Sequence, residues 1–345
     1  MIGEAFGARA SRRVAAAVRA LLSLVLTLGV LLFVTFGLST LSTVDPALKL
    51  VGDHASEASY QQARQGLGLD RPWHQRLARY ATAVVHGDLG VSQSTGNSVA
   101  TDLARVFMAT VELATLAMLA SSMAGVALAI AAALRPAGLW DALVRLLSIV
   151  GNSLPILWLG LLALYLFYAR LQWVGGPGRL GDAYEYTIDM PTGWVLVDAW
   201  RSHEEGAFAS AVSHIVLPVL LLCAYSVGNV TRLTRAALLA ETGKDYVLLA
   251  RATGASELRV LVHHVLPNVA TVVLTVLALG YADLLQGAVL VETVFARPGI
   301  GRYLTTALLA GDTPAILGST LVIGGCFVLI NGLTDVCGRL LDPRL

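Results

Sequence analysis

The residues of this chain that could act in catalysis form none of the short patterns that catalysis requires. The sequence has no G-x-x-x-x-G-K-[ST] string, the phosphate-binding loop of nucleotide hydrolases. It has no H-E-x-x-H or G-x-S-x-G string, and the adjacent His263 and His264 point in different directions on a helix. We therefore expect no catalytic residue, no metal ligand and no cofactor in this chain.

Two other patterns have structural interpretations. The G-x-G-x-x-G string at 176–181 follows an apolar run of membrane-spanning length, whereas a dinucleotide site needs a strand before it and a helix after it. We interpret it as a loop. The three cysteines, Cys223, Cys326 and Cys337, are far apart and have no C-x-x-C spacing, so we interpret them as small buried hydrophobic residues.

Asp283 is the least expected ionisable residue, because it interrupts a long apolar stretch. A charge near the centre of a membrane span costs roughly 2.5 kcal/mol or more, so such a residue is a candidate functional site. With Gln286 it can line a water-filled path, where its carboxylate would meet a peptide α-ammonium or a divalent metal. Alternatively, it pairs with an arginine of a partner chain or lies near the outer interface. Both interpretations stay open.

The composition indicates that these residues belong to a membrane protein. The chain has 345 residues, of which 56% are hydrophobic and 14% charged, against about 25% charged in soluble proteins. This excludes a water-soluble domain. The formal net charge is +1, so the chain lacks the basic surface that nucleic-acid binding requires, and we expect no nucleic-acid partner.

Six apolar runs approach the roughly 20 residues that a membrane-spanning helix needs. They predict an all-α polytopic membrane protein with six transmembrane helices. Four runs are free of charge throughout: Ala20–Val44, Leu113–Leu134, Leu146–Ala169 and Ala315–Thr334. Two are shorter, and we expect their helices to extend past the flanking charges: Ile215–Thr231 and Val265–Ala282. The first run is too long for the apolar core of a cleavable signal, about 7 to 15 residues, so we expect a retained anchor.

The arginines predict the orientation, because short cytoplasmic connections carry the excess of positive charge. With six crossings the arginine-rich connections fall on one side, and both termini are cytoplasmic. We expect a cytoplasmic N-terminus over 1–19, a transmembrane helix over 20–44, an external segment over 45–108, a core with five transmembrane helices over 109–340, and a cytoplasmic tail over 341–345. Further external segments run from Arg170 to His214 and from Glu292 to Thr313.

The cytoplasmic segment 232–267 predicts a helix-turn-helix outside the bilayer. Asp245–Ala252 is a short helical stretch with Tyr246, Leu249 and Ala250 on one side, and Gly254 breaks it. A second short helix can begin after Ser256 and end at Leu266, before Pro267. Its apolar face is too small to form a core, so we expect a protein partner to cover it; the alternative is a helix at the lipid interface.

At these residues the chain resembles the binding-protein-dependent ABC importer permeases. The stretch 245–255, followed by Leu266-Pro267-Asn268, is similar to their cytoplasmic coupling loop, E-A-A-x3-G-x9-I-x-L-P. Leu248 and Leu249 replace the Glu and the first Ala, and His264 replaces the Ile, as in the dipeptide/oligopeptide/nickel subfamily. Further blocks resemble the first permease subunit of that subfamily: 66–72, 87–92, 291–295, 298–301 and 341–344.

The resemblance implies a type I ABC importer transmembrane fold in the bacterial inner membrane. It implies a homologous second permease, two cytoplasmic ATPase subunits or domains that hold ATP and Mg, and an external solute-binding protein. The residues implied in coupling to the ATPase are Asp245, Tyr246, Leu249, Ala250, Arg251, Gly254 and Pro267. Those implied in an external gate are Glu292, Phe295, Pro298 and Gly299.

The cargo stays less defined than the architecture. Di- or oligopeptides are the first choice, and nickel or a chelated metal is the second, because no histidines or clustered soft ligands lie along the predicted spans. A more distant alternative is an ATP-independent secondary carrier, but that would need paired interrupted helices in two related halves. Glu112, Asp335 and Glu292 lie at span ends, where we expect them to serve packing, anchoring or the gate.

Overall fold

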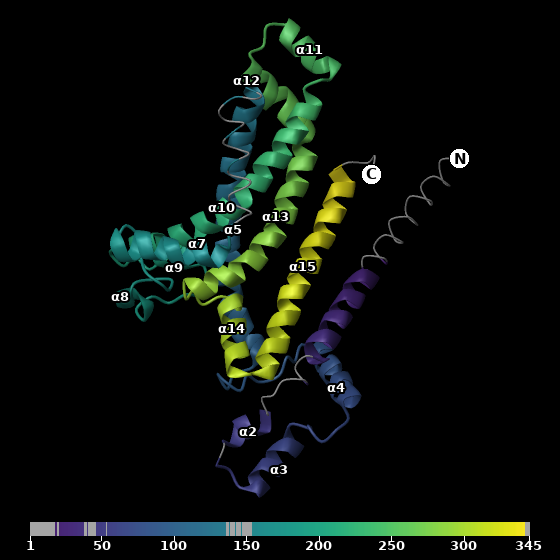
Figure 1. Ribbon diagram of the computed structural model, residues 1–345, viewed down its shortest axis with the longest axis vertical. Coiled ribbons are helices and arrows are strands. Elements are labelled where there is room, and N and C mark those ends of the chain that lie inside the picture. Colours follow the sequence, from purple (N-terminus) through teal and green to yellow (C-terminus); the bar gives the residue numbers. More distant parts are fainter. Residues whose placement is uncertain are drawn as a thin grey trace, which may run out of the picture. The chain divides into compact units, whose positions relative to one another are not determined.

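The computed structural model describes residues 21–37, 46–52, 54–135 and 154–341, together with 18, 40, 138, 142 and 146. The described residues are helical apart from turns, loops and an isolated antiparallel bridge between Val91 and Ser98 (Figure 1). Nearly all of the expected N-terminal segment 1–19, the tail beyond 341, residues 147–153 of the third apolar run and the Asp335 side chain lie outside this description.

Four described helices are long and apolar enough to cross a membrane. They are α5 (Val99–Leu134), α10 (Ala207–Glu241), the continuous helix Glu257–Val294 and α15 (Thr313–Leu341), whose qualifying stretch is Thr313–Thr334. Each contains one of the predicted apolar runs. The other two runs contain shorter apolar helices, Leu21–Gly37 and Ile156–Arg170, the latter made of α7 (Ile156–Ala163) and the π-helix η1 (Leu164–Arg170). Four of the six predicted crossings are therefore confirmed as helices of spanning length.

The two shorter predicted runs do extend past their flanking charges. Helix α10 continues through Arg232 and Arg235 to Glu241, and α13 (Leu266–Val294) continues through Asp283. The prediction that a separate short helix ends at Leu266 is wrong. The helix α12 (Glu257–Arg259) leads through the π-helix η2 (Val260–Val265) directly into α13, so Pro267 stands within a continuous helix. Proline lacks the N–H that would bond to the preceding turn, and its ring crowds that turn. The wider π-helical turns of η2 lie just before Pro267, where this crowding occurs.

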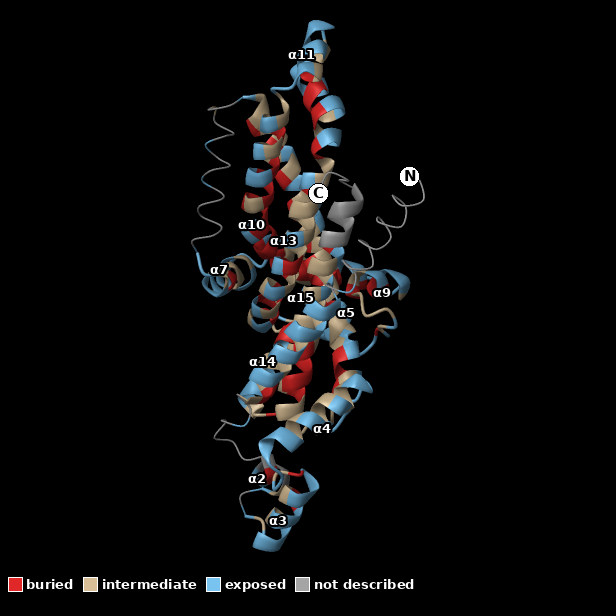
Figure 2. Ribbon diagram, turned by 90° about the vertical axis from the view of Figure 1, so that its right-hand side faces the viewer, coloured by how far each residue is buried: buried red, intermediate tan, exposed pale blue. Residues whose placement is uncertain are grey.

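The described chain divides into two compact units. The larger comprises residues 106–302 with 333–345, and its core lies between α5, α7, α10 and α13, of which α10 and α13 pack along each other (Figure 2). Leu113, Leu222 and Leu284 lie at its centre and are completely buried. A second cluster in the same unit contains α8 (Asp182–Glu185) and α9 (Val195–Arg201), which fold over the first turns of α10.

The smaller unit comprises residues 1–105 with 303–332. It contains the helix Leu21–Gly37, α2 (Pro46–Val51), α3 (Glu57–Gly66), α4 (Trp73–Val85), the start of α5, the part of α14 (Ile300–Ala310) from Tyr303 onward, and α15 to Gly332. Phe36 at the end of the first helix stacks on Tyr80 of α4 with 6.3 Å between ring centroids. Residues 87–96 form a loop, with positive φ at Gly87, Gly90 and Gly96.

Candidate functional site

The short helix predicted over Asp245–Ala252 is confirmed as α11 (Asp245–Ala252), which lies between the ends of two long helices (Figure 1). Gly254 ends it with φ of +87°, a left-handed conformation that glycine adopts without a Cβ clash. Ser256 caps the following helix, as predicted, and its hydroxyl accepts a hydrogen bond from the Arg259 N–H at 3.4 Å. Helix α11 is therefore joined to the Glu257–Val294 helix by a tight turn.

Helix α11 has an inner and an outer face. Val247 is completely buried in a cluster with Leu238 of α10 and Val260 and Val265 of η2, and Tyr246 and Ala250 pack partly against that cluster. Leu248 and Leu249 point away and are 56% and 67% exposed. Of the three residues grouped on one side by their spacing, Tyr246 and Ala250 pack partly against this cluster, whereas Leu249 is left exposed. Val247 is the residue of α11 that is most deeply buried in this cluster. The spacing of Tyr246, Leu249 and Ala250 did not predict its burial.

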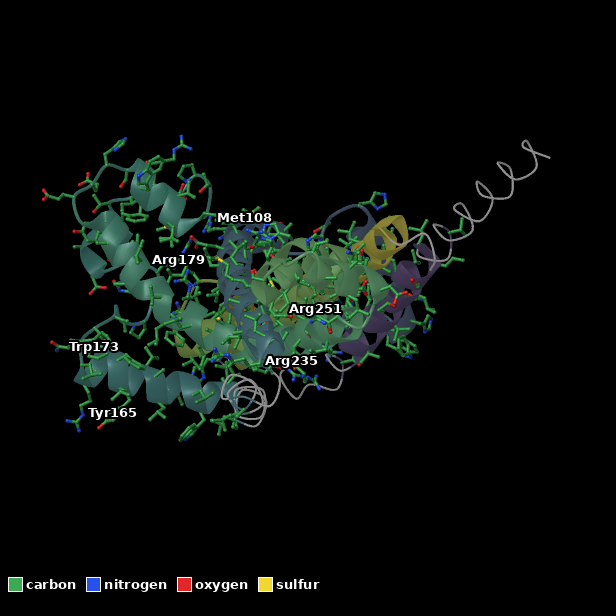
Figure 3. The ribbon with its side chains drawn as sticks, turned by 90° about the horizontal axis from the view of Figure 1, so that it is seen from above. Met108, Tyr165, Trp173, Arg179, Arg235 and Arg251 are labelled. Atoms are coloured by element: carbon green, nitrogen blue, oxygen red, sulfur yellow. The ribbon has the colours of Figure 1, made fainter. Side chains whose placement is uncertain are left out.

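Polar contacts hold both ends of α11. The Tyr246 hydroxyl donates to Glu241 Oε1 at 3.0 Å, and Lys244 Nζ lies 2.8 Å from Glu241 Oε2. Partial burial, together with the hydrogen bond to this carboxylate, raises the pKa of Tyr246. At the other end Arg251 pairs with Glu257 at 3.0 Å (Figure 3 labels Arg251). The arm is therefore held to both long helices while its outer face stays open.

The two candidate path residues share one face of α13. Asp283 and Gln286 are exposed, and so are Leu279 and Leu290, which lie one turn before and one turn after them. Leu284 and Ala288 lie on the opposite, buried side. The described chain therefore leaves uncovered a helix stripe that is apolar except for a carboxylate and an amide.

The candidate gate residues come together at the end of α13. Glu292 and Phe295 are buried, Pro298 is half-buried, and a Cβ at Gly299 would overlap the Glu292 carboxylate. Glu292 Oε2 accepts a hydrogen bond from the Gly301 N–H at 2.8 Å. The loop 295–299 is also tied to other segments. The Phe295 carbonyl accepts from the Gly178 N–H at 2.8 Å, and Thr110 Oγ1 of α5 accepts from the Ile300 N–H at 2.9 Å.

The sequence analysis missed two arginines of this site, Arg297 and Arg179. It gave their shared partner, Glu112, only a general role in packing, anchoring or the gate. Arg297 and Arg179 are buried, and each lies near the same atom, Glu112 Oε2, at 3.6 and 3.5 Å from their Nη2 atoms. Arg179 is labelled in Figure 3. Burial lowers the pKa of Arg297 to about 10, so Arg297 stays charged at neutral pH, and burial also lowers the pKa of Arg179. The available signal was Arg297 itself, a charge placed between two predicted gate residues.

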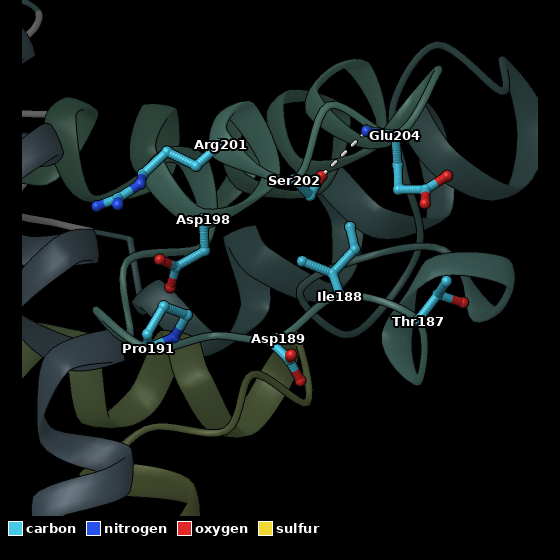
Figure 4. A pocket seen from close by; sticks show the side chains of 8 residues that line it. All are labelled: Thr187, Ile188, Asp189, Pro191, Asp198, Arg201, Ser202 and Glu204. Atoms are coloured by element: carbon cyan, nitrogen blue, oxygen red, sulfur yellow. Dashed lines mark hydrogen bonds between the residues drawn. The ribbon is translucent and has the colours of Figure 1, made fainter.

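A cavity of about 330 Å³ opens between α8 and α9 (Figure 4). Its lining residues are Thr187, Ile188, Asp189, Pro191, Asp198, Arg201, Ser202 and Glu204. The buried carboxylate of Asp198 is already used, because it accepts from the Thr192 hydroxyl at 2.7 Å and from the Gly193 N–H at 3.0 Å. It therefore holds the loop that precedes α9.

Across the described ranges, no three His, Cys, Asp or Glu residues gather closely enough to hold a metal ion.

Two family models match the sequence. Residues 125–345 match the model described as "Binding-protein-dependent transport system inner membrane component". Residues 14–118 match the model described as "Binding-prot-dependent transport system membrane comp, N-term". The first match contains α11, the exposed stripe of α13 and the gate loop.

The chain is similar over most of its length to several curated proteins. It is 40% identical over 325 residues to the probable D,D-dipeptide transport system permease protein DdpB of Escherichia coli K12, covering 93% of this chain and 94% of that protein. It is 36% identical over 312 residues to the di/tripeptide transport system permease protein DppB of Pseudomonas aeruginosa, covering 90% and 92%. It is 36% identical over 313 residues to the dipeptide transport system permease protein DppB of Haemophilus influenzae, covering 90% and 93%.

Proposed function

This chain belongs to the family of binding-protein-dependent transport system inner membrane components, and we propose that it forms half of the path by which di- and oligopeptides cross the membrane. It is a permease subunit of an ATP-driven importer, and ATP hydrolysis belongs to separate partner subunits. The full assembly would contain a homologous second permease, two cytoplasmic ATPase subunits or domains that hold ATP and Mg, and an external solute-binding protein.

The observation that carries the proposal is the outer face of α11. Its inner face is packed and both of its ends are held, yet Leu248 and Leu249 are left in solvent. Exposed leucines on an anchored arm fit docking to an ATPase. Docking would move α10 and α13 together, because α11 packs against residues of α10 and η2. ATP binding shifts the permease between two packings only if the ATPase contacts them unequally.

The proposed topology has six crossings in a type I ABC importer arrangement. The helix Leu21–Gly37 and the helix Ile156–Arg170 would supply the two crossings beyond the four helices of spanning length. Tyr165 within the last part of the latter and Trp173 just after it are exposed, and such residues fit a membrane interface. Residues 45–108 would form an external segment, and both termini would be cytoplasmic.

Peptide is the proposed cargo, because the similar proteins described above are named as dipeptide and di/tripeptide permeases. Asp283 and Gln286 would line the path, where the carboxylate can meet a peptide α-ammonium. Glu292, Phe295, Pro298 and Gly299 would form the external gate.

Reconstitution tests the proposal. The chain is purified under mild detergent with its co-purifying subunits, and uptake of radiolabelled dialanine is measured in proteoliposomes that contain the external binding protein. We expect uptake that requires ATP and is not reduced by excess Ni²⁺. Uptake by the isolated chain without ATP would instead indicate a secondary carrier, and ATP-driven Ni²⁺ uptake without dialanine uptake would indicate a metal importer.

A further inference from the structure

Glu112 is a buried carboxylate that contacts three segments distant in sequence. It lies on α5 and is completely buried. Its Oε1 accepts a hydrogen bond from the Leu196 N–H at the start of α9, at 3.0 Å. Its Oε2 lies 3.5 Å from Arg179 Nη2 and 3.6 Å from Arg297 Nη2. One oxygen is therefore shared by an arginine of the external segment and an arginine of the gate loop.

The two oxygens of Glu112 make different kinds of contact. The bond to Leu196 has ordinary hydrogen-bond length, whereas the two arginine distances exceed it. Among the described residues, neither Glu112 Oε2 nor any nitrogen of the Arg297 guanidinium has a hydrogen-bond partner. A charge contact of this kind has little directional restraint, so small movements of the segments can break and remake it. A permanent structural joint would gain more from direct hydrogen bonds.

The charges nevertheless depend strongly on one another. Arg297 is 0% exposed, and a buried ion without a counter-ion is much less favourable than a paired one. The Glu112 carboxylate lies near both Arg297 and Arg179 and compensates the two together. Displacing one arginine therefore changes the electrostatic environment of the other through the shared carboxylate.

The external segment and the gate loop also meet directly. Gly178, next to Arg179, donates its N–H to the carbonyl of Phe295, two residues before Arg297. Both segments thus contact each other through the backbone and contact α5 through the same carboxylate. Movement of 178–196 has a physical route to the gate loop 295–299.

We propose that Glu112 is a positioning residue for the outer gate, whose Oε2 links the external segment 178–196 to the gate loop through Arg179 and Arg297. This inference rests on the proposed function, because it assigns the route by which an event on the external face reaches the gate. Binding-protein docking on the external face would shift Arg179, weaken its contact with Glu112 and thereby release the gate loop. The residues transmit this displacement and need not touch the cargo.

The test is a double-variant cycle on the complete complex in proteoliposomes. The readout is the stimulation ratio, the rate of ATP hydrolysis with dialanine-loaded binding protein divided by the rate without it. We expect Glu112→Gln and Arg297→Met each to lower this ratio about tenfold, equivalent to about 1.4 kcal/mol of lost coupling. The double variant should resemble either single variant, because both remove the same interaction. Arg297→Lys, which keeps the charge, should stay within about threefold of the unmodified complex.

Arg201→Met is the matched control, since Arg201 is an exposed arginine of α9 outside this charge cluster. It should leave the ratio unchanged. The inference is overturned if Glu112→Gln behaves like this control, or if the double variant shows the product of the single effects, about a hundredfold. If the complex with Glu112→Gln fails to assemble, the same cycle is measured with Arg179→Met and Arg297→Met. A double variant that resembles either single variant supports the inference, and a product of the two single effects overturns it. An unmodified complex without stimulation would instead contradict the proposed function.

Discussion

Gly254 illustrates how one backbone conformation determines the position of a whole arm. Its φ of +87° is unfavourable for residues with a Cβ, and no atom lies within 4 Å of where a Cβ would stand. Gly254→Val should therefore act through backbone strain alone, about 1–2 kcal/mol. We expect normal membrane insertion with reduced transport per ATP hydrolysed. Gly254→Asn should be milder, because asparagine tolerates left-handed conformations. Equal coupling in all three proteins would contradict this assignment.

The carboxylate of Asp283 gives a second prediction for a single residue, which concerns recognition of the peptide cargo. Asp283→Asn keeps the shape of the side chain and removes its charge from the exposed stripe of α13. If the carboxylate meets the peptide ammonium, the apparent KM for dialanine uptake should rise about tenfold, the loss of roughly 1.4 kcal/mol. Competition by N-acetyl-dialanine, which lacks the ammonium, should not change between the variant and the unmodified protein. An unaltered KM would favour the pairing of Asp283 with a partner chain or an interfacial position.

Within the element α11, substitutions on the buried face should affect stability, whereas substitutions on the exposed face should affect ATPase docking. Val247→Ala removes buried methyl groups and should lower stability by about 2 kcal/mol, seen as a lower thermal unfolding midpoint. Leu249→Ala alters an exposed side chain, so its effect on stability should stay within about 0.5 kcal/mol. It should nevertheless reduce the amount of ATPase that co-purifies. Undiminished ATPase binding with Leu249→Ala would exclude this leucine from the interface.

The loop 92–97 is fastened to the start of α15 by Asp312. The Asp312 carboxylate accepts from the Ser92 hydroxyl at 2.6 Å, the Ser94 N–H at 2.9 Å and the Ala315 N–H at 3.2 Å. Burial alone would raise the pKa of Asp312, but these hydrogen bonds together outweigh it and the pKa is lowered. The ionised form is thus favoured in the folded state.

This shift predicts a pH dependence. A lowered pKa contributes stability that is complete above the unfolded-state pKa of about 3.9 and is lost as the pH falls through the folded-state value below it. The unfolding midpoint of the purified protein should therefore decline more steeply below pH 4 than that of Asp312→Asn, which does not titrate. Parallel curves for the two proteins would show that this carboxylate makes no such contribution.

Across the whole molecule, the sequence predicts elements better than their contacts. Long apolar runs indicated all four helices of spanning length, and Gly254 with Ser256 marked the turn after α11. The link between Glu112 and Arg297 was missed because pairing across distant segments depends on tertiary packing. The break expected before Pro267 was wrong for a related reason, since neighbouring helices can stabilise a helix that local proline chemistry disfavours.

The central claim is that α11 is held by a separate ATPase on the cytoplasmic side. It is tested most directly by cross-linking Leu249→Cys, in a variant whose three native cysteines are replaced, within the complete complex. We predict a cross-link to the ATPase whose yield changes when ATP is bound, and no labelling of this position by a membrane-impermeant thiol reagent added outside intact cells. Labelling from outside, or full dialanine uptake by the chain without any ATPase, would contradict the account.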